Sequence, residues 1–166
     1  MYELYVLCRR HTPAPPGGFE ALQGQPRVNE LRPDDYDGYW KTIGAQYLQT
    51  EPRAVFRVHR TEGGSMSVME SLAKAIADAG DGVVLSREPV TMPWRFNVEH
   101  EGREPPADWT ALLARAEHYR EEERRQVEEA RRKLAKEKAR WEAKMGPEDL
   151  KEIDFTDALG LGDNKD

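Results

Sequence analysis

Cysteine is almost absent from this chain: Cys8 is the single one among 166 residues. One cysteine rules out an intramolecular disulfide framework and is typical of a reducing compartment. No run approaches the roughly eighteen consecutive apolar residues of a membrane-spanning helix. The opening residues, Met1-Tyr2-Glu3, lack the features of a signal peptide. We therefore expect a cytoplasmic protein that does not enter a membrane.

Motifs of catalysis and cofactor binding are also missing. The glycine spacings of a P-loop and of a Rossmann fold do not occur, and neither does Gly-x-Ser-x-Gly. Four histidines stand apart from other metal-ligating residues, which argues against a zinc site; they are His11, His59, His100 and His118. A Ser-His-Asp arrangement built from distant segments leaves no such spacing and stays open. We expect no cofactor and no metal, and the balance is against an enzyme.

An excess of basic residues is lacking as well. The chain has 25 Lys and Arg against 31 Asp and Glu, a net charge of −6. Because phosphate-backbone binding needs a positive surface, nucleic-acid binding is disfavoured, and an acidic protein suits a basic partner. The basic run Arg131–Lys144 is a local exception that includes Trp141. Glu137 and Glu142 interrupt it, and we interpret it as a solvated helix face.

The composition predicts how the chain is divided. It is 34% charged and 38% hydrophobic, which is too polar for one compact ball and too apolar for wholesale disorder. We expect an α+β globular domain over residues 1–105 and a long charged helix over 106–146 whose start docks on that domain. An acidic tail over 147–166 follows.

Periodicity predicts the elements of the globular domain. Apolar residues alternate with polar ones in strands and recur three or four apart in helices. The expected strands are Tyr2–Arg10, Ala54–Arg60, Val83–Leu85 and Trp94–His100. The expected helices are 34–48 and 67–80, the second with a Ser67–Glu70 capping box. A loop is expected from Pro13 to about Pro33.

The order of these elements predicts the fold class. The strand–helix–strand unit over 54–85 should place its two strands side by side and parallel. The last strand should lie antiparallel at an edge. We expect an α+β fold: a small mixed β-sheet of about four strands with two helices on one face, followed by the long charged C-terminal helix.

The long helix has no breaker between its expected cap, Asp108, and Gly146-Pro147. Its first turns carry apolar residues such as Trp109 and Leu112, enough to dock on the domain. Beyond Tyr119 the apolar stripe is too sparse for a strong coiled coil. Pairs of opposite charge four residues apart can stabilise a solvated helix instead.

Two candidate binding surfaces emerge. If Phe56, Val58, Phe96 and Val98 face the helices, the opposite face of the sheet is polar and joined by Glu3 and Tyr5. Its candidate residues are Arg57, His59, Arg95, Asn97 and Glu99. This face either binds a ligand or partner, or is merely solvated or covered.

The second candidate surface is the tail. Acidic residues there surround apolar anchors, and the candidates are Glu148, Asp149, Glu152, Asp154 and Phe155. The tail either meets a partner or neutralises the basic run of its own chain.

These observations favour a non-catalytic protein that binds another protein. Its most concrete form is an immunity or antitoxin-type inhibitor of a cognate bacterial toxin, with a basic toxin domain as the partner; this is an analogy of class. One alternative is a structural protein of a bacterium or phage that forms homo-oligomers through the long helix. The other is a small-ligand binder or an enzyme that uses the polar sheet face.

Overall fold

The structure is a computed structural model that describes residues 3–12, 15, 18, 26–62, 64–88 and 95–145. Five strands and three helices form within them. In chain order they are β1 (Glu3–Cys8), β2 (Arg27–Leu31), α1 (Asp35–Tyr47), β3 (Ala54–His59), α2 (Met66–Gly80), β4 (Gly82–Arg87), β5 (Phe96–Glu101) and α3 (Trp109–Lys144).

The five strands form one sheet in the order β2-β3-β1-β4-β5, and every neighbouring pair is antiparallel. The α+β class with a long C-terminal helix is confirmed, although the sheet is antiparallel and has five strands. β3 and β4 run in the same direction, but β1 lies between them. β1 takes the central place because its run from Leu4 to Cys8 is entirely buried, as expected of a strand with neighbours on both sides.

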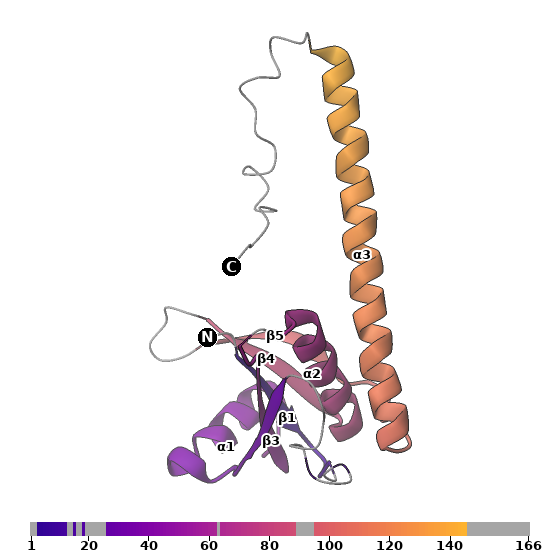
Figure 1. The fold of residues 1–166 in the computed structure, drawn as a ribbon. Coiled ribbons are helices and arrows are strands. Elements are labelled where there is room, and N and C mark those ends of the chain that lie inside the picture. The colour runs from indigo at the N-terminus through magenta and orange to yellow at the C-terminus, as the bar shows by residue number, and fades with distance from the viewer. Residues whose placement is uncertain are drawn as a thin grey trace. The chain divides into compact units, whose positions relative to one another are not determined.

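The two faces of the sheet are both apolar, and each carries a helix. Leu4, Val6 and Cys8 of β1 pack with α2 on one face. Tyr5 and Leu7 alternate with them and pack with α1 on the other. Figure 1 shows α1 and α2 on opposite sides of the sheet. The expectation of two helices on one face was therefore wrong, because a doubly buried central strand requires cover on both faces.

β2 lies within the segment expected to be a loop. It is an edge strand that buries Val28 and leaves Arg27, Asn29 and Glu30 exposed. With one buried side chain in five residues, its sequence hardly differs from that of a loop. The strand matters because its last residue, Leu31, reaches the α1 face.

α2 ends against the middle of the sheet. A β-carbon on Gly80 would lie 2.3 Å from the sulfur of Cys8, so only glycine fits this contact. Asp81 then turns the chain with a φ of 50°, and β4 follows directly. Burial raises the pKa of the Cys8 thiol to about 12, which makes this cysteine a packed apolar residue and no nucleophile.

The chain divides into two compact units, residues 1–123 and 124–166. In the first, the start of α3 packs on the α2 side of the core: Leu112 is buried, and Trp109 and Ala116 lie against the same cluster. In the second, the described part of α3 is a charged, largely exposed helix. Within the described ranges, no helix is both long and apolar enough to cross a membrane.

Candidate functional site

A pocket of about 360 Å³ opens on the α1 face of the sheet. Strands β1, β2, β3 and β4 form its floor, and α1 forms its wall. We call it the α1-face pocket; its lining residues are Glu3, Tyr5, Leu31, Tyr39, Trp40, Arg57 and Arg87. Its volume lies within the range of about 300–1,000 Å³ that small-molecule sites occupy.

The strand register places the polar floor of this pocket. β1 and β3 pair so that Tyr5 lies opposite Arg57 and Glu3 lies opposite His59. Directly opposite residues in antiparallel strands point to the same face. The four side chains therefore form a polar patch at one end of the two strands. The buried apolar pair Leu7 and Val55 lies next to it on the same face.

Aromatic rings pack against one another in and behind the pocket wall. The Tyr5 and Trp40 ring centroids lie 4.8 Å apart, and those of Tyr39 and Trp40 lie 5.2 Å apart. Phe96 of β5 meets Tyr5 edge-on at 5.7 Å. Trp40 is only 3% exposed, so the cluster is anchored in the core and only part of it reaches the cavity.

The charge in the pocket comes from two arginines and one glutamate, Arg57, Arg87 and Glu3. The Tyr5 hydroxyl donates a 2.6 Å hydrogen bond to Glu3. Burial, and then this bond, raise the pKa of Tyr5 far above its usual value, although both arginines oppose the shift. Glu3 is thus engaged by Tyr5, and the guanidinium groups provide the positive charge that a ligand would meet.

His59 lies beside this pocket. Burial, and then the charge of Arg57, lower the pKa of His59, with Glu3 opposing. The ring is therefore neutral at pH 7. The positive charge at the pocket therefore comes from Arg57 and Arg87 and not from His59.

Some buried polar atoms of the pocket residues have no hydrogen-bond partner within the described part of the chain. Among them are the donors Nε1 of Trp40 and Nε of Arg57. A buried donor without an acceptor costs about 1–3 kcal/mol of stability. Such groups are rare in native proteins, and one explanation is an acceptor that arrives with a ligand.

The structure brings only part of the expected polar sheet face together. Arg57 and His59 share the α1 face with Glu3 and Tyr5. Asn97 lies opposite Ser86 on the α2 face, and Glu99 accepts a hydrogen bond from Ser86 there. The expectation that these five residues share one face was therefore wrong.

The cause is the register of β5. Phe96 pairs with Arg87 and packs in the α1-face core, while Val98 pairs with Leu85. The sequence analysis supposed that both side chains face the two helices together with Phe56 and Val58, which pack on the α2 side. A one-residue shift in the register of a strand moves every side chain to the other face of the sheet. The alternation of apolar and polar residues alone does not show on which face the apolar side chains lie.

The remaining candidates are Arg95 of the polar sheet face and the residues of the tail. Arg95 immediately precedes β5 and is exposed. The tail candidates lie outside the described residues, namely Glu148, Asp149, Glu152, Asp154 and Phe155.

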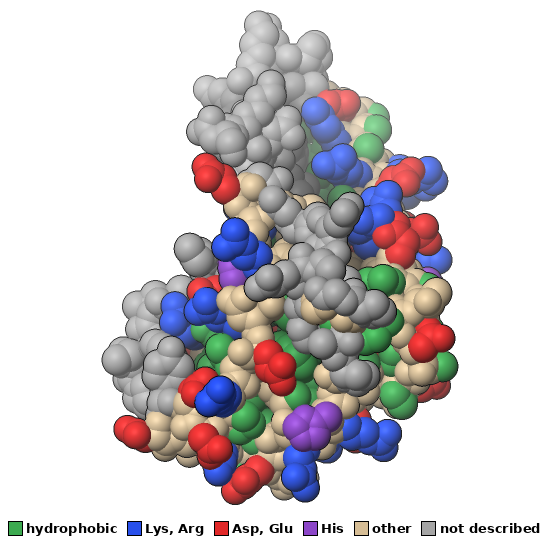
Figure 2. Space-filling model, turned by 60° about the horizontal axis from the view of Figure 1, so that its bottom comes forward, with side chains coloured by type: hydrophobic (Ala, Val, Ile, Leu, Met, Phe, Trp, Pro, Cys, Tyr) green, Lys and Arg blue, Asp and Glu red, His purple; other side chains and the backbone are tan. Residues whose placement is uncertain are grey.

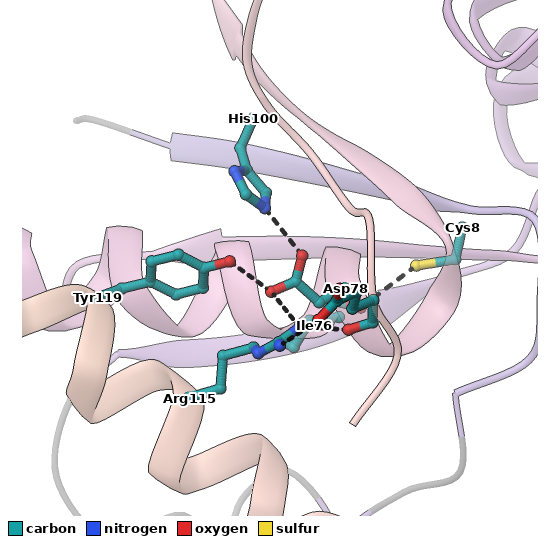
Figure 3. A network of polar contacts seen from close by, with 7 residues as sticks. Cys8, Ile76, Asp78, His100, Arg115 and Tyr119 are labelled. Carbon is teal, nitrogen blue, oxygen red and sulfur yellow. Dashed lines mark hydrogen bonds and ion pairs between the residues drawn. The ribbon is translucent and has the colours of Figure 1, made fainter. Parts of the chain in front are cut away.

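A buried polar cluster around Asp78 was not anticipated from the sequence. Asp78 of α2 is 1% exposed. It accepts a 2.6 Å hydrogen bond from Tyr119 and lies 3.0 Å from Nε2 of His100 and 3.4 Å from Arg115. Figure 3 shows these side chains of β5 and α3 converging on the carboxylate. The Asp78 cluster therefore ties three elements together.

The electrostatics of this cluster favour an ionised Asp78. Burial alone raises the pKa of Asp78, but the hydrogen bonds from His100 and Tyr119 and the charge of Arg115 lower it further than burial raises it. Burial and the bond to Asp78 raise the pKa of Tyr119, which stays protonated as a donor. A satisfied buried carboxylate of this kind fixes geometry, and we assign it a structural role.

A β-bulge makes the cluster possible. Val84 pairs with His100 while Leu85 pairs with Val98, so Glu99 is an extra residue in β5. The bulge turns both Glu99 and His100 towards α2, as bulges re-aim side chains next to sites. No sequence signal marks this event, and Asp78 lies 22 residues from His100 and 41 from Tyr119.

A second polar contact fastens α3 to α2. Glu123 accepts hydrogen bonds from Ser67 and Lys74, each 2.7 Å long. This contact gives Glu123 a structural role in holding α3 against α2. It also corrects the expected capping box: α2 begins after Ser65, and the Ser67 hydroxyl bonds to Glu123.

Metal chemistry finds no support within the described ranges, where no group of three or more His, Cys, Asp or Glu side chains is placed to hold an ion. No family model, no curated protein and no solved structure matches this chain.

Proposed function

We propose that this chain is a cytoplasmic binding protein that recognises another protein through the α1-face pocket. The observation that carries the proposal is the pocket itself, with aromatic walls, two arginines and the unpaired donors of Trp40 and Arg57. Its occupant is a side chain of the partner that combines an anionic group with an apolar stem.

The residue types in the pocket support protein recognition. Trp, Tyr and Arg dominate the hot spots of protein interfaces because they bury large rigid areas and keep a polar group for a directed bond. All three types line this pocket. An arginine can also hold a carboxylate with two parallel hydrogen bonds.

The charge around the pocket adds selectivity. Figure 2 shows acidic and basic side chains mixed over the face in view, and the whole chain carries −6. A partner is therefore attracted over long distances if it is basic, whereas the pocket accepts an anionic group at contact. The most concrete form of this proposal is an immunity or antitoxin-type inhibitor of a bacterial toxin with a basic surface. The small size and the acidity of the chain support this form.

Affinity capture from the native host tests the proposal. The tagged wild-type chain should recover one foreign protein in stoichiometric amount, and Arg57→Glu should lose it. Arg53→Glu is the matched control, because Arg53 is exposed and does not line the pocket. Equal recovery by both variants, with both folded by circular dichroism, would place the interface elsewhere.

A second candidate function is the binding of a free small molecule, which the volume of the pocket favours. Benzoate and phenyl phosphate serve as probes because each joins a flat apolar ring to an anion. Thermal unfolding should shift upwards with these probes for the wild type and for Arg53→Glu, and not for Arg57→Glu. A shift without any captured protein favours this second function.

A further inference from the structure

An apolar stripe runs along the part of α3 in the second unit. Val127, Ala130, Leu134 and Trp141 recur at the first and fourth positions of successive heptads, the a and d positions of a coiled coil. Val127 is 52% exposed and Trp141 is 53% exposed. Single exposed apolar residues are common on protein surfaces, so what points to an interface here is their regular spacing along one side of the helix.

The residues on both sides of the stripe carry one sign of charge. In a coiled coil these are the e and g positions, which face the partner helix and select it. Here they are Arg124, Arg131 and Lys138 on one side and Gln126, Lys133 and Arg140 on the other. The stripe is thus flanked by five basic residues and no acidic one. We call it the basic-flanked stripe.

The acidic residues of this stretch lie elsewhere on the helix. Glu128 and Glu129 occupy b and c positions, away from the stripe, and Glu128 pairs there with Arg132 at 2.6 Å. Glu137 falls within the stripe at a d position. Lys138 approaches Glu142 at 3.9 Å, with both side chains about half exposed, and so loose a surface pair holds Lys138 only weakly.

This charge pattern opposes pairing between two copies of the helix. In a parallel pair each g position meets an e position, and in an antiparallel pair e meets e and g meets g. Every such contact here would join two basic residues, or a basic residue and Gln126, or two glutamines. Like charges at these positions destabilise the pair, so the alternative of a homo-oligomer that forms through the long helix gains no support from this charge pattern.

We propose that the basic-flanked stripe binds an acidic amphipathic helix of another protein, with apolar residues at a and d and Glu or Asp at e and g. Such a helix covers Val127, Leu134 and Trp141 and meets basic residues along both edges. The sparse stripe makes association depend on charge, and therefore on salt.

Other acidic occupants fit less well. A nucleic acid would leave the apolar residues uncovered, and four apolar positions in two heptads are few for a membrane-surface helix. The chain's own tail is acidic, but Leu150, Ile153, Phe155 and Leu159 are spaced three, two and four apart. That spacing departs from the alternating three and four of a heptad.

The test uses the full-length chain and two synthetic helical peptides of three heptads. Both have Leu at a and d; one has Glu and the other Lys at e and g. The Glu peptide should bind in fluorescence anisotropy, and the Lys peptide should not. High salt should weaken binding by roughly tenfold, because several exposed ion pairs are screened together.

Charge reversal on opposite sides of the helix supplies the matched variants. Arg131→Glu with Lys138→Glu should abolish binding of the Glu peptide and create binding of the Lys peptide. Arg132→Glu with Lys136→Glu makes the same change of net charge at f and c positions, away from the stripe, and should keep the wild-type preference. Trp141→Ala should weaken Glu-peptide binding at every salt concentration. Circular dichroism checks that each variant stays helical.

The proposal is overturned if the wild type does not bind the Glu peptide, or if both charge-reversal variants lose binding equally. It is also overturned if the Glu peptide binds only after residues 147–166 are removed, since the tail would then be the occupant. Tighter binding of duplex DNA or anionic vesicles, lost in Arg131→Glu with Lys138→Glu, would overturn it as well. Arg57→Glu should leave all peptide results unchanged, so this test and that of the α1-face pocket fail independently.

Discussion

The hydroxyl of Tyr119 donates a 2.6 Å hydrogen bond to the carboxylate of Asp78, joining α3 to α2 inside the first unit. His100 and Arg115 complete the cluster around the same carboxylate. Because these partners come from β5 and α3, the contact carries part of the stability of the whole unit.

Asp78→Ala should lower the free energy of unfolding by about 3–5 kcal/mol, because it removes the buried carboxylate and leaves its donors unpaired. Urea denaturation followed by circular dichroism measures this. Glu121→Ala, an exposed position on α3, should change it by less than about 0.5 kcal/mol. Comparable losses in both variants would show that Asp78 is not central.

The acid limb of the stability curve should also depend on Asp78. Its pKa is lower in the folded protein than in the unfolded chain, so the unfolded state takes up the proton first as pH falls. The stabilisation is complete above the unfolded pKa, about 3.9, and is lost as pH falls through the folded pKa. Asp78→Asn should therefore flatten the decline of stability below about pH 4 in urea titrations. A slope identical to that of the wild type would contradict this.

Glu70 should behave in the opposite sense. Burial, and then the charge of Glu123, raise the pKa of Glu70. Its ionised form is thus disfavoured in the folded state, and its contribution to stability grows as pH falls from neutral towards the unfolded pKa. Glu70→Gln should stabilise the protein at pH 7 by up to about 1 kcal/mol and weaken this dependence. Thermal unfolding at pH 7 and pH 5 measures both effects, and a destabilised Glu70→Gln at pH 7 would contradict the assignment.

The register of β5 gives a paired prediction. Phe96 is buried against Tyr5 and Tyr47, so Phe96→Ala should cost about 3–5 kcal/mol. Val98 is 47% exposed, and Val98→Ala should cost less than about 1 kcal/mol. Chemical denaturation of the two variants decides the matter; equal losses would favour the register in which both side chains face α2.

Removal of residues 126–166 should leave the first unit folded, since the buried residues of the described chain end at Leu112 and the contacts of Glu123 remain. The free energy of unfolding should change by less than about 1 kcal/mol. Circular dichroism and urea denaturation of the shortened chain measure this. Precipitation or loss of cooperative unfolding would show that distal residues belong to the core.

The sequence predicts the single elements better than their arrangement. Alternation marks β3, the apolar stripe up to Gly80 marks α2, and the absence of breakers marks α3. Such signals are local. The places of β1 and β5 depend on which of two apolar layers each strand joins, and apolarity on both faces leaves that undecided.

The sequence likewise predicts some residues of the candidate site and misses others. Arg57 and His59 were found because they lie two apart on one strand. The wall of the α1-face pocket was interpreted as core, and Trp40 is indeed buried; only the fold reveals that its neighbours border a cavity. The Asp78 cluster depends on an extra residue in β5, which no periodicity reports.

The contact between Gly80 and Cys8 has a practical consequence. Cys8 is the only thiol in the sequence and lies on the central strand, fully buried beneath the end of α2. A thiol reagent reaches it only when α2 lifts from β1 or the strand detaches. The rate at which Cys8 is alkylated in the native protein therefore measures how often the contact between α2 and β1 opens. A bound partner or ligand that stabilises this contact should slow the alkylation.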